Sequence, residues 1–196
     1  GKRYTLTALL EAMQPDQPQF DRGGGVTLSG GEPMAQAAFA IAFARALRAR
    51  GIHVAMETCG QGREADFRAI APYVNLFLFD YKATGAETHR RLTGVDGALI
   101  RRNMEVLDAL GCPMVLRCPL IPGVNDSDEH LTAIADTVRS HPSIVGLELL
   151  PYHRMGETKR LQLGQNEALP QLQAFGFAHA VVGQQLQPHN GGVKPN

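Results

Sequence analysis

Short apolar segments alternate with helical patterns along most of this chain, and the alternation limits the possible folds more than any other feature. The segments are rich in β-branched and aromatic residues, as buried strands are; they span residues 25–29, 52–58, 75–81, 113–119, 144–150 and, more weakly, 178–182. Strand–helix–strand connections place parallel strands in one sheet. The sequence therefore predicts an α/β fold whose parallel sheet is either open or curled into a barrel.

The helical patterns carry recognisable end signals. Residues 35–50 and 98–110 each lead to a glycine, Gly51 and Gly111, at the point where a helix ends in a left-handed residue. Both segments are long enough to cover a strand, so we expect them to be the crossover helices of the sheet.

Hydroxyl and carboxylate residues predict where two further helices begin. We expect Thr5 or Thr7 to cap a first helix and Asp126 or Ser127 to cap the helix that runs to about residue 139. Residues 14–24 contain two prolines and are expected to form a loop.

Composition excludes several classes of function. The chain has 196 residues, 44% of them hydrophobic, which is enough for one sizeable core over residues 1–186, with a disordered tail at 187–196. Its formal net charge is zero, so nothing indicates a nucleic-acid partner. No apolar run is long enough for a membrane span, and no signal peptide opens the sequence. We expect a cytoplasmic protein without a membrane partner.

The cysteines do not form a recognisable motif. Cys59, Cys112 and Cys118 are odd in number and widely spaced, and no two stand in a C-x-x-C relation. This pattern argues against a disulfide framework and against a metal site. We expect three inert, buried thiols.

A glycine-rich loop follows the first predicted strand. Residues 23–33 read GGGVTLSGGEP, in which Gly30 and Gly31 allow the backbone to approach a ligand closely. Glu32 offers carboxylate oxygens to an ammonium group, and Pro33 suits the first turn of a helix. Alone, such a loop is also typical of an ordinary strand-to-helix turn.

Polar side chains recur where successive strands end. In a barrel of parallel strands, ligand-binding residues gather at the carboxyl ends of the strands. The candidates at these positions are Glu32, Glu57 with Thr58, Asp80 with Lys82, Arg117, and His153. Arg117 lies in an otherwise apolar segment, so it needs an anionic partner, either a ligand or a core carboxylate.

Taken in order, these motifs resemble a known family. The segments are GGGVTLSGGEP at 23–33, GIH at 51–53 with ETCG at 57–60, FDYK at 79–82, LR at 116–117 with IPGVND at 121–126, and ELLPYH at 148–153. They are similar to the glycyl-radical-enzyme activating enzymes, which are radical S-adenosylmethionine (SAM) proteins and include pyruvate formate-lyase activating enzyme. The resemblance covers roughly residues 1–164.

The resemblance implies a partial (β/α) barrel of the radical SAM type that lacks its first βα unit. The family carries a C-x-x-x-C-x-x-C loop that binds a [4Fe–4S] cluster, and this sequence contains no such loop. We therefore expect a fragment that is inactive alone, with the cluster belonging to the intact protein.

The resemblance also implies roles for individual residues. Ser29, Gly30, Gly31 and Glu32 would receive the ammonium group of SAM, and Asp80 and Lys82 would lie beside the cofactor. Arg117 would contact its carboxylate or ribose, and His153 would lie against the adenine. A cation near the cofactor carboxylate would take oxygen ligands from Glu57, Thr58 and Asp80. The resemblance assigns no catalytic residue to this chain.

The implied activity is an oxidoreductase reaction in which a 5′-deoxyadenosyl radical installs a glycyl radical on a partner enzyme of the pyruvate formate-lyase type. The implied partners are a glycyl radical enzyme and an electron donor such as flavodoxin or ferredoxin. Two alternatives stay open: a non-catalytic module that binds an adenosyl ligand or a partner protein, and an activase of another radical SAM branch, such as that of the anaerobic ribonucleotide reductase.

Overall fold

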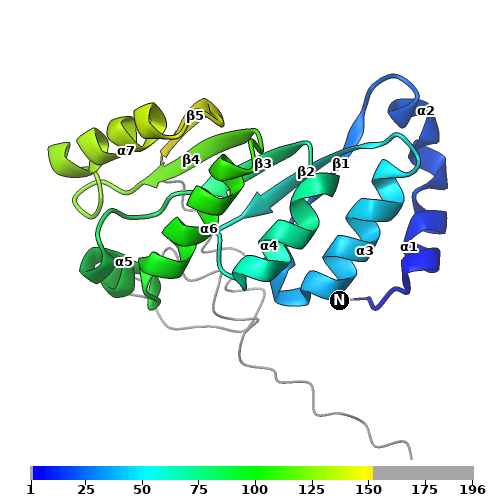
Figure 1. Ribbon diagram of the computed structural model, residues 1–196, viewed down its shortest axis with the longest axis horizontal. Coiled ribbons are helices and arrows are strands. Elements are labelled where there is room, and N and C mark those ends of the chain that lie inside the picture. Colours follow the sequence, from blue (N-terminus) through cyan, green and yellow to red (C-terminus); the bar gives the residue numbers. More distant parts are fainter. Residues whose placement is uncertain (1, 152–196) are drawn as a thin grey trace, which may run out of the picture.

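The computed structural model describes residues 2–151 and shows a parallel sheet of five strands in the order β1-β2-β3-β4-β5 (Figure 1). The strands are β1 (Gly25–Leu28), β2 (His53–Thr58), β3 (Leu76–Asp80), β4 (Met114–Leu120) and β5 (Ile144–Pro151). Every neighbouring pair is parallel. The predicted α/β fold is confirmed, and it is consistent with part of a β/α barrel. The weaker strand at 178–182, His153 and the tail at 187–196 lie outside the described residues.

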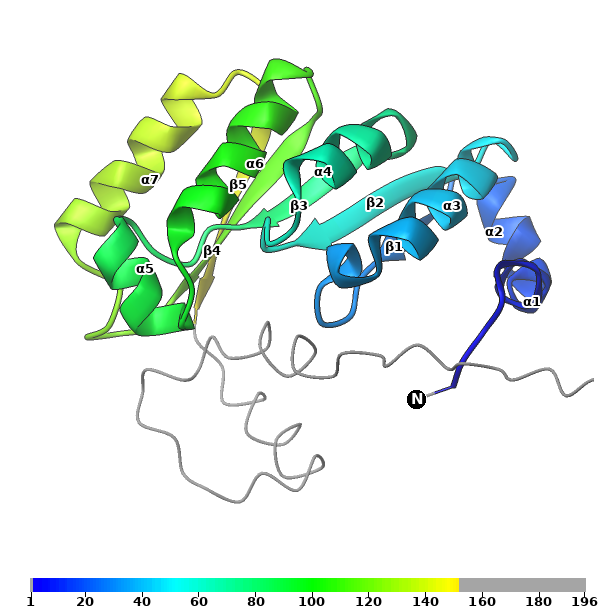
Figure 2. The same cartoon turned by 60° about the horizontal axis from the view of Figure 1, so that its bottom comes forward.

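Helices follow the strands. The α-helices are α1 (Leu6–Ala12), α2 (Gln17–Phe20), α3 (Ala37–Arg48), α4 (Glu64–Ile70), α5 (Ala86–Thr93), α6 (Gly97–Ala109) and α7 (Asp128–Ser140). Two of those that follow strands, α4 and α5, were not predicted from the sequence. The 3₁₀ turns are η1 (Gln14–Asp16), η2 (Pro33–Gln36) and η3 (Ala71–Tyr73). Helices α3, α4, α6 and α7 lie along one face of the sheet (Figure 2).

The core lies between this helix layer and the sheet. Val54, Met56, Phe77, Phe79 and Leu116 alternate along β2, β3 and β4 and are fully buried on the helix side. Large side chains meet them from the helices, among them Leu47, Phe67, Ile70, Leu107 and Ile134. Burying each such side chain contributes about 1.5–3 kcal/mol. The alternation leaves the other residues of each strand on the opposite face.

We call that opposite face the open face; Thr27, Ala55, Glu57, Leu78, Asp80, Val115 and Arg117 define it. These residues are exposed or half-buried, and within residues 2–151 no helix packs over them (Figure 2). Polar side chains therefore stay accessible on one face of a sheet whose other face is packed.

End signals confirm several sequence predictions. Thr5 caps α1 by accepting a hydrogen bond from Ala8 N, and Ser127 caps α7 by accepting one from His130 N. Gly51 and Gly111 have φ angles of 75° and 68°, as left-handed residues after a helix do.

Two expectations need correction. Residues 14–24 contain η1 and α2 instead of a continuous loop, because Pro15 and Pro18 occupy first-turn positions, where a missing N–H costs nothing. The crossover after β1 begins as the separate turn η2 at Pro33, before α3.

Within the described residues, no helix is long and apolar enough to cross a bilayer.

Candidate functional site

Four side chains meet on the open face, one from the loop after β1 and one each from β2, β3 and β4. The Ser29 hydroxyl donates a hydrogen bond to Glu57 Oε2 at 2.5 Å, and Arg117 Nη1 donates one to Glu57 Oε1 at 2.8 Å. Arg117 Nε lies 3.4 Å from Asp80 Oδ1. We call Ser29, Glu57, Asp80 and Arg117 the open-face cluster. The structure thus brings together four of the residues that the sequence singled out.

The two carboxylates of the cluster differ in environment. The hydrogen bond from Ser29, supported by Arg117, lowers the pKa of Glu57 in spite of its partial burial. Burial raises the pKa of Asp80, although the charges of Lys82 and Arg117 oppose this. Asp80 Oδ1 and Arg117 Nε are both buried, and neither has a hydrogen-bond partner among the described residues. The two atoms lie 3.4 Å apart, so the contact between them is an ion pair that is too long for a good hydrogen bond.

Glu148 is a neighbour of the cluster that sequence reasoning missed. It stands opposite Arg117 in the register of β4 and β5. Burial opposes the charge of Arg117, but Asp80, Glu57 and Glu148 together raise its pKa. Three carboxylates therefore surround one guanidinium. The signal in the sequence was a lone charge within the apolar strand 144–150.

Asn125, a second residue that sequence reasoning missed, holds the backbone of Lys82 by a hydrogen bond to its carbonyl. The Asn125 amide donates hydrogen bonds to the carbonyls of Lys82 and Pro119, at 3.0 and 2.8 Å, and accepts one from Ile121 N at 2.7 Å. Its side chain is buried. Asn125 therefore ties the loop after β3 to the loop after β4, and a turn residue such as Asn after Pro-Gly was the signal.

Glu32 is turned into the protein. Its Oε1 accepts hydrogen bonds from Met34 N and the Thr58 hydroxyl, and its Oε2 accepts from Cys59 N and the Cys59 thiol. Only 8% of the residue is exposed. These donors occupy the acceptor sites of the carboxylate in this conformation. The contact between Glu32 and the cofactor ammonium stays a prediction, while the geometry indicates that Glu32 fixes the loop after β1 to the loop after β2.

Two glycines in the loops joined by Glu32, Gly30 and Gly60, have positive φ angles but different surroundings. Gly30 has φ 124° with open space where a Cβ would lie, so the backbone of this loop faces outward. Gly60 has φ 77°, and a Cβ there would lie 2.5 Å from the Phe79 ring. Asn103 holds the same loop by donating to the carbonyls of Gly60 and Gly62. The two loops are therefore rigid, and Ser29, Gly30 and Gly31 form their accessible edge.

Thr58 does not join the other expected cation ligands. Its hydroxyl donates to Glu32 and accepts from Gly60 N, on the face of β2 opposite Glu57. Glu57 and Asp80 share the charge of Arg117 instead. Among residues 2–151 no group of three or more His, Cys, Asp or Glu side chains could hold a metal ion.

The cysteines do not fit an iron–sulfur cluster. All three are buried and unpaired with one another. Burial, the largest influence, raises the pKa of Cys59 and of Cys118 to about 12, so these thiols stay protonated, whereas cluster ligation needs thiolates. We therefore assign no cluster ligand to the described residues.

Comparison with known proteins shows the family of the chain. The family model of the Radical SAM superfamily matches residues 4–134. The chain is 40% identical over 168 residues to the isethionate sulfite-lyase activating enzyme of Desulfovibrio desulfuricans, a match that covers 84% of this chain and 54% of the relative. It is 39% identical to the choline trimethylamine-lyase activating enzyme of Oleidesulfovibrio alaskensis, with the same coverage. The chain thus spans about half the length of the curated relatives it matches.

A solved structure shares the architecture. A domain of a pyruvate-formate lyase-activating enzyme from Bacteroides vulgatus superimposes with a TM-score of 0.61 and 26% sequence identity. The match covers 81% of this chain and 95% of that domain.

Proposed function

The chain belongs to the radical SAM superfamily, and on this basis we propose that it forms the SAM-binding part of an activating enzyme for a glycyl radical enzyme. The single observation that carries the proposal is the open-face cluster, since it joins side chains from four strand ends where a barrel of this kind binds its ligand. The curated relatives named above are activating enzymes, which supports the same proposed function.

The charge of the open face suits SAM. Glu57, Asp80 and Glu148 carry three negative charges around Arg117, with Lys82 as a second cation nearby. A ligand with a sulfonium and an ammonium group is attracted by the excess of carboxylates. Its own carboxylate needs a cation, which Arg117 or Lys82 supplies. The residues present therefore fit the cofactor.

We assign the residues that would hold SAM by their chemistry. Asp80, the last residue of β3, would accept hydrogen bonds from donor groups of the cofactor. The backbone of Ser29, Gly30 and Gly31 offers carbonyl oxygens to the ammonium group, while Glu32 keeps that loop in place. Bound SAM, together with a reduced cluster, would supply the radical that removes a hydrogen atom from a glycine.

The chain's own contribution is positioning. Arg117 bridges Glu57 and Asp80 across β2, β3 and β4, so the strand ends keep a fixed spacing. Asn125 holds the Lys82 carbonyl, which fixes the loop beside Asp80. A rigid site is needed because a reactive radical must meet one hydrogen atom and no solvent.

We propose a glycyl radical enzyme as the protein substrate and a flavodoxin or ferredoxin as the electron donor. Relatives act for different enzymes: isethionate sulfite-lyase, choline trimethylamine-lyase and trans-4-hydroxy-L-proline dehydratase. The proposal therefore extends to this class of partner and not to the pyruvate formate-lyase type in particular.

A chimera tests the proposed function. The part of the Desulfovibrio desulfuricans relative that this chain does not span is joined to this chain, reconstituted anaerobically and supplied with reductant and SAM. We expect cleavage of SAM to 5′-deoxyadenosine and a glycyl radical signal on isethionate sulfite-lyase by electron paramagnetic resonance. Asp80→Asn in the same chimera should abolish both. A chimera that holds a cluster and binds its partner, yet leaves SAM intact, would contradict the proposal.

A second candidate is a module that binds an adenosyl ligand without redox chemistry, because the open-face cluster would serve such a module equally. That alternative predicts tight SAM binding by this chain and no SAM cleavage by the chimera.

A further inference from the structure

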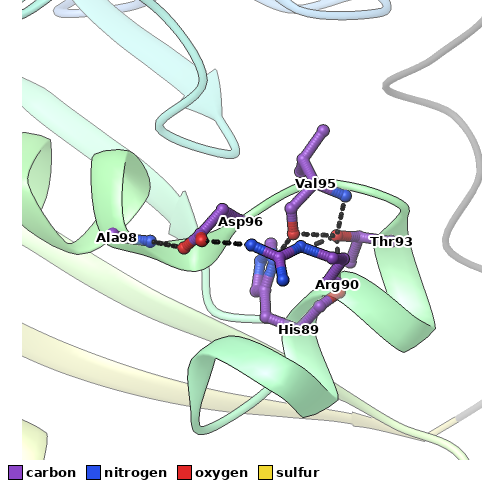
Figure 3. A network of polar contacts seen from close by, with 6 residues as sticks. All are labelled: His89, Arg90, Thr93, Val95, Asp96 and Ala98. Carbon is purple, nitrogen blue, oxygen red and sulfur yellow. Dashed lines mark hydrogen bonds and ion pairs between the residues drawn. The ribbon is translucent and has the colours of Figure 1, made fainter.

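The corner between α5 and α6 holds the imidazole of His89 in one orientation (Figure 3). His89 Nδ1 lies 2.9 Å from the carbonyl oxygen of Val95 and 3.0 Å from the Thr93 hydroxyl. Only 5% of His89 is exposed, and its ring packs against Gly97, where a Cβ would lie 3.0 Å from Cγ. The ring therefore cannot turn without disturbing the corner.

The corner itself is braced from both helices. Arg90 of α5 forms an ion pair with Asp96 at 2.6 Å, and Asp96 caps α6 by accepting from Ala98 N at 2.8 Å. Figure 3 shows both contacts next to the imidazole. Such bracing fixes where the free edge of the His89 ring lies.

The hydrogen bond to Val95 determines the tautomer. A carbonyl oxygen can only accept, so Nδ1 carries the proton and donates it. In the neutral ring, Nε2 is then an acceptor with a free lone pair. Among the described residues Nε2 has no hydrogen-bond partner, whereas Nδ1 has two neighbours.

His89 lines a cavity of about 40 Å³ between the end of β3 and the α5–α6 corner. Phe79, Ile100 and Met104 line its apolar part, and Lys82 and Arg101 also line it. Neither cation forms an ion pair within residues 2–151. The volume exceeds what one water molecule needs and admits a small polar group.

The charges along the cavity favour an anion. Asp80 is the carboxylate that lines it, and Arg117 lies 3.4 Å from that carboxylate. The charged residues that line the cavity are thus two cations, Lys82 and Arg101, and one carboxylate, Asp80. Gly85, another lining residue, precedes α5 and has no side chain to cap it, so the first N–H groups of this helix add partial positive charge.

We propose that this cavity is a binding site for a small oxyanion that also carries a hydroxyl group, such as hydrogen phosphate or a hydroxycarboxylate. The anionic oxygens accept from Lys82 and Arg101, and the hydroxyl donates to His89 Nε2. Both requirements follow from the arrangement: two free cations and one fixed lone pair. The cavity shares Asp80 and Lys82 with the proposed cofactor site, so the test of this proposal is made without SAM.

Nuclear magnetic resonance of the full chain tests the site. The ¹⁵N signals of the His89 ring are followed while glycolate, acetate or inorganic phosphate is added, without SAM. Glycolate and acetate form a matched pair that differs in the hydroxyl group. We expect glycolate and phosphate to shift the Nε2 signal with saturation, and acetate to bind about 2- to 10-fold more weakly, as for one lost hydrogen bond.

Arg101 and Arg102 provide a matched pair of variants, since they are adjacent, exposed residues of α6. Arg101 lines the cavity, whereas Arg102 pairs with Glu64. Arg101→Gln should weaken glycolate binding about 2- to 10-fold, and Arg102→Gln should leave it unchanged.

Three results would overturn the proposal. The first is a His89 signal that none of the three anions shifts. The second is equal binding of glycolate and acetate, and the third is equal weakening by Arg101→Gln and Arg102→Gln. Because the substituted side chains are exposed, loss of the fold would not explain the outcome. If the chimera described above fails while glycolate binds as expected, only the proposed function is lost.

Discussion

Asp80 on β3 and Arg117 on β4 are register partners, and Arg117 Nε lies 3.4 Å from Asp80 Oδ1. Both atoms are buried without a hydrogen-bond partner among the described residues. On its other side, Arg117 donates to Glu57 at 2.8 Å. One guanidinium therefore joins β2, β3 and β4 by charge, at the end of the sheet where we place the cofactor.

Arg117→Met should lower the free energy of unfolding by about 1–3 kcal/mol. The substitution leaves Glu57 and Asp80 without their shared cation, and this cost is below that of a deeply buried pair because both carboxylates are partly exposed. Urea denaturation measures it. Arg139→Met removes an exposed pair with Asp136 and should change the value by less than about 0.5 kcal/mol. Equal losses in the two variants would refute the special role of Arg117.

Glu32→Gln should destabilise this chain by about 1.5–3 kcal/mol, the range for hydrogen bonds to a charged group. The new amide would face either the Thr58 and Met34 donors or those of Cys59. Glu11→Gln, at an exposed position, serves as the control, with a change below about 0.5 kcal/mol. Chemical denaturation of both variants decides the matter. An unchanged stability in Glu32→Gln would mean that the carboxylate is free for a ligand.

The stability of the chain should depend on pH through His130. Burial lowers the pKa of His130 from its ordinary value of 6.5, so the neutral ring favours the folded state. This contribution is fully present above the unfolded-state pKa and is lost as the pH falls through the lowered folded-state pKa. Between about pH 7.5 and about pH 5, the wild-type chain should lose more stability than His130→Gln. Parallel pH profiles for the two proteins would contradict this.

Anaerobic reconstitution of this chain with iron and sulfide should give no stoichiometric [4Fe–4S] absorption and no reductive cleavage of SAM. The reason is that Cys59 and Cys118 are buried with pKa values of about 12, and among residues 2–151 no group of three or more His, Cys, Asp or Glu side chains could hold a metal ion. A stable cluster at one per chain would show that the cysteines converge after all.

The sequence predicted the fold well where periodicity and end signals agree. The five described strands fall within one or two residues of their predicted bounds, and Thr5, Ser127, Gly51 and Gly111 end or begin helices as expected. Helix α4 was not predicted, because Glu64–Ile70 is too short to show a clear period. Pro15 and Pro18 led to the prediction of a loop where the structure has η1 and α2, because proline both starts helices and breaks them.

The sequence predicted which residues belong to the candidate site, but not which contacts they make. Strand-end position placed Ser29, Glu57, Asp80 and Arg117 in one region, and the structure joins them. Which carboxylate faces inward depends on the loop conformation, and so Glu32 could not be distinguished from Glu57 by sequence. Asn125 and Glu148 act through backbone and register partners far apart in the chain, which a single sequence does not reveal.

Isothermal titration calorimetry of this chain with SAM tests the central claim most directly, because the open-face cluster is proposed to bind the cofactor. The account predicts saturable binding at one site, weakened at least about tenfold by Asp80→Asn, since this removes a charged partner from the cluster. Asp136→Asn, an exposed residue of α7, should leave the affinity unchanged. Absence of SAM binding, or the same affinity in Asp80→Asn as in Asp136→Asn, would contradict the account.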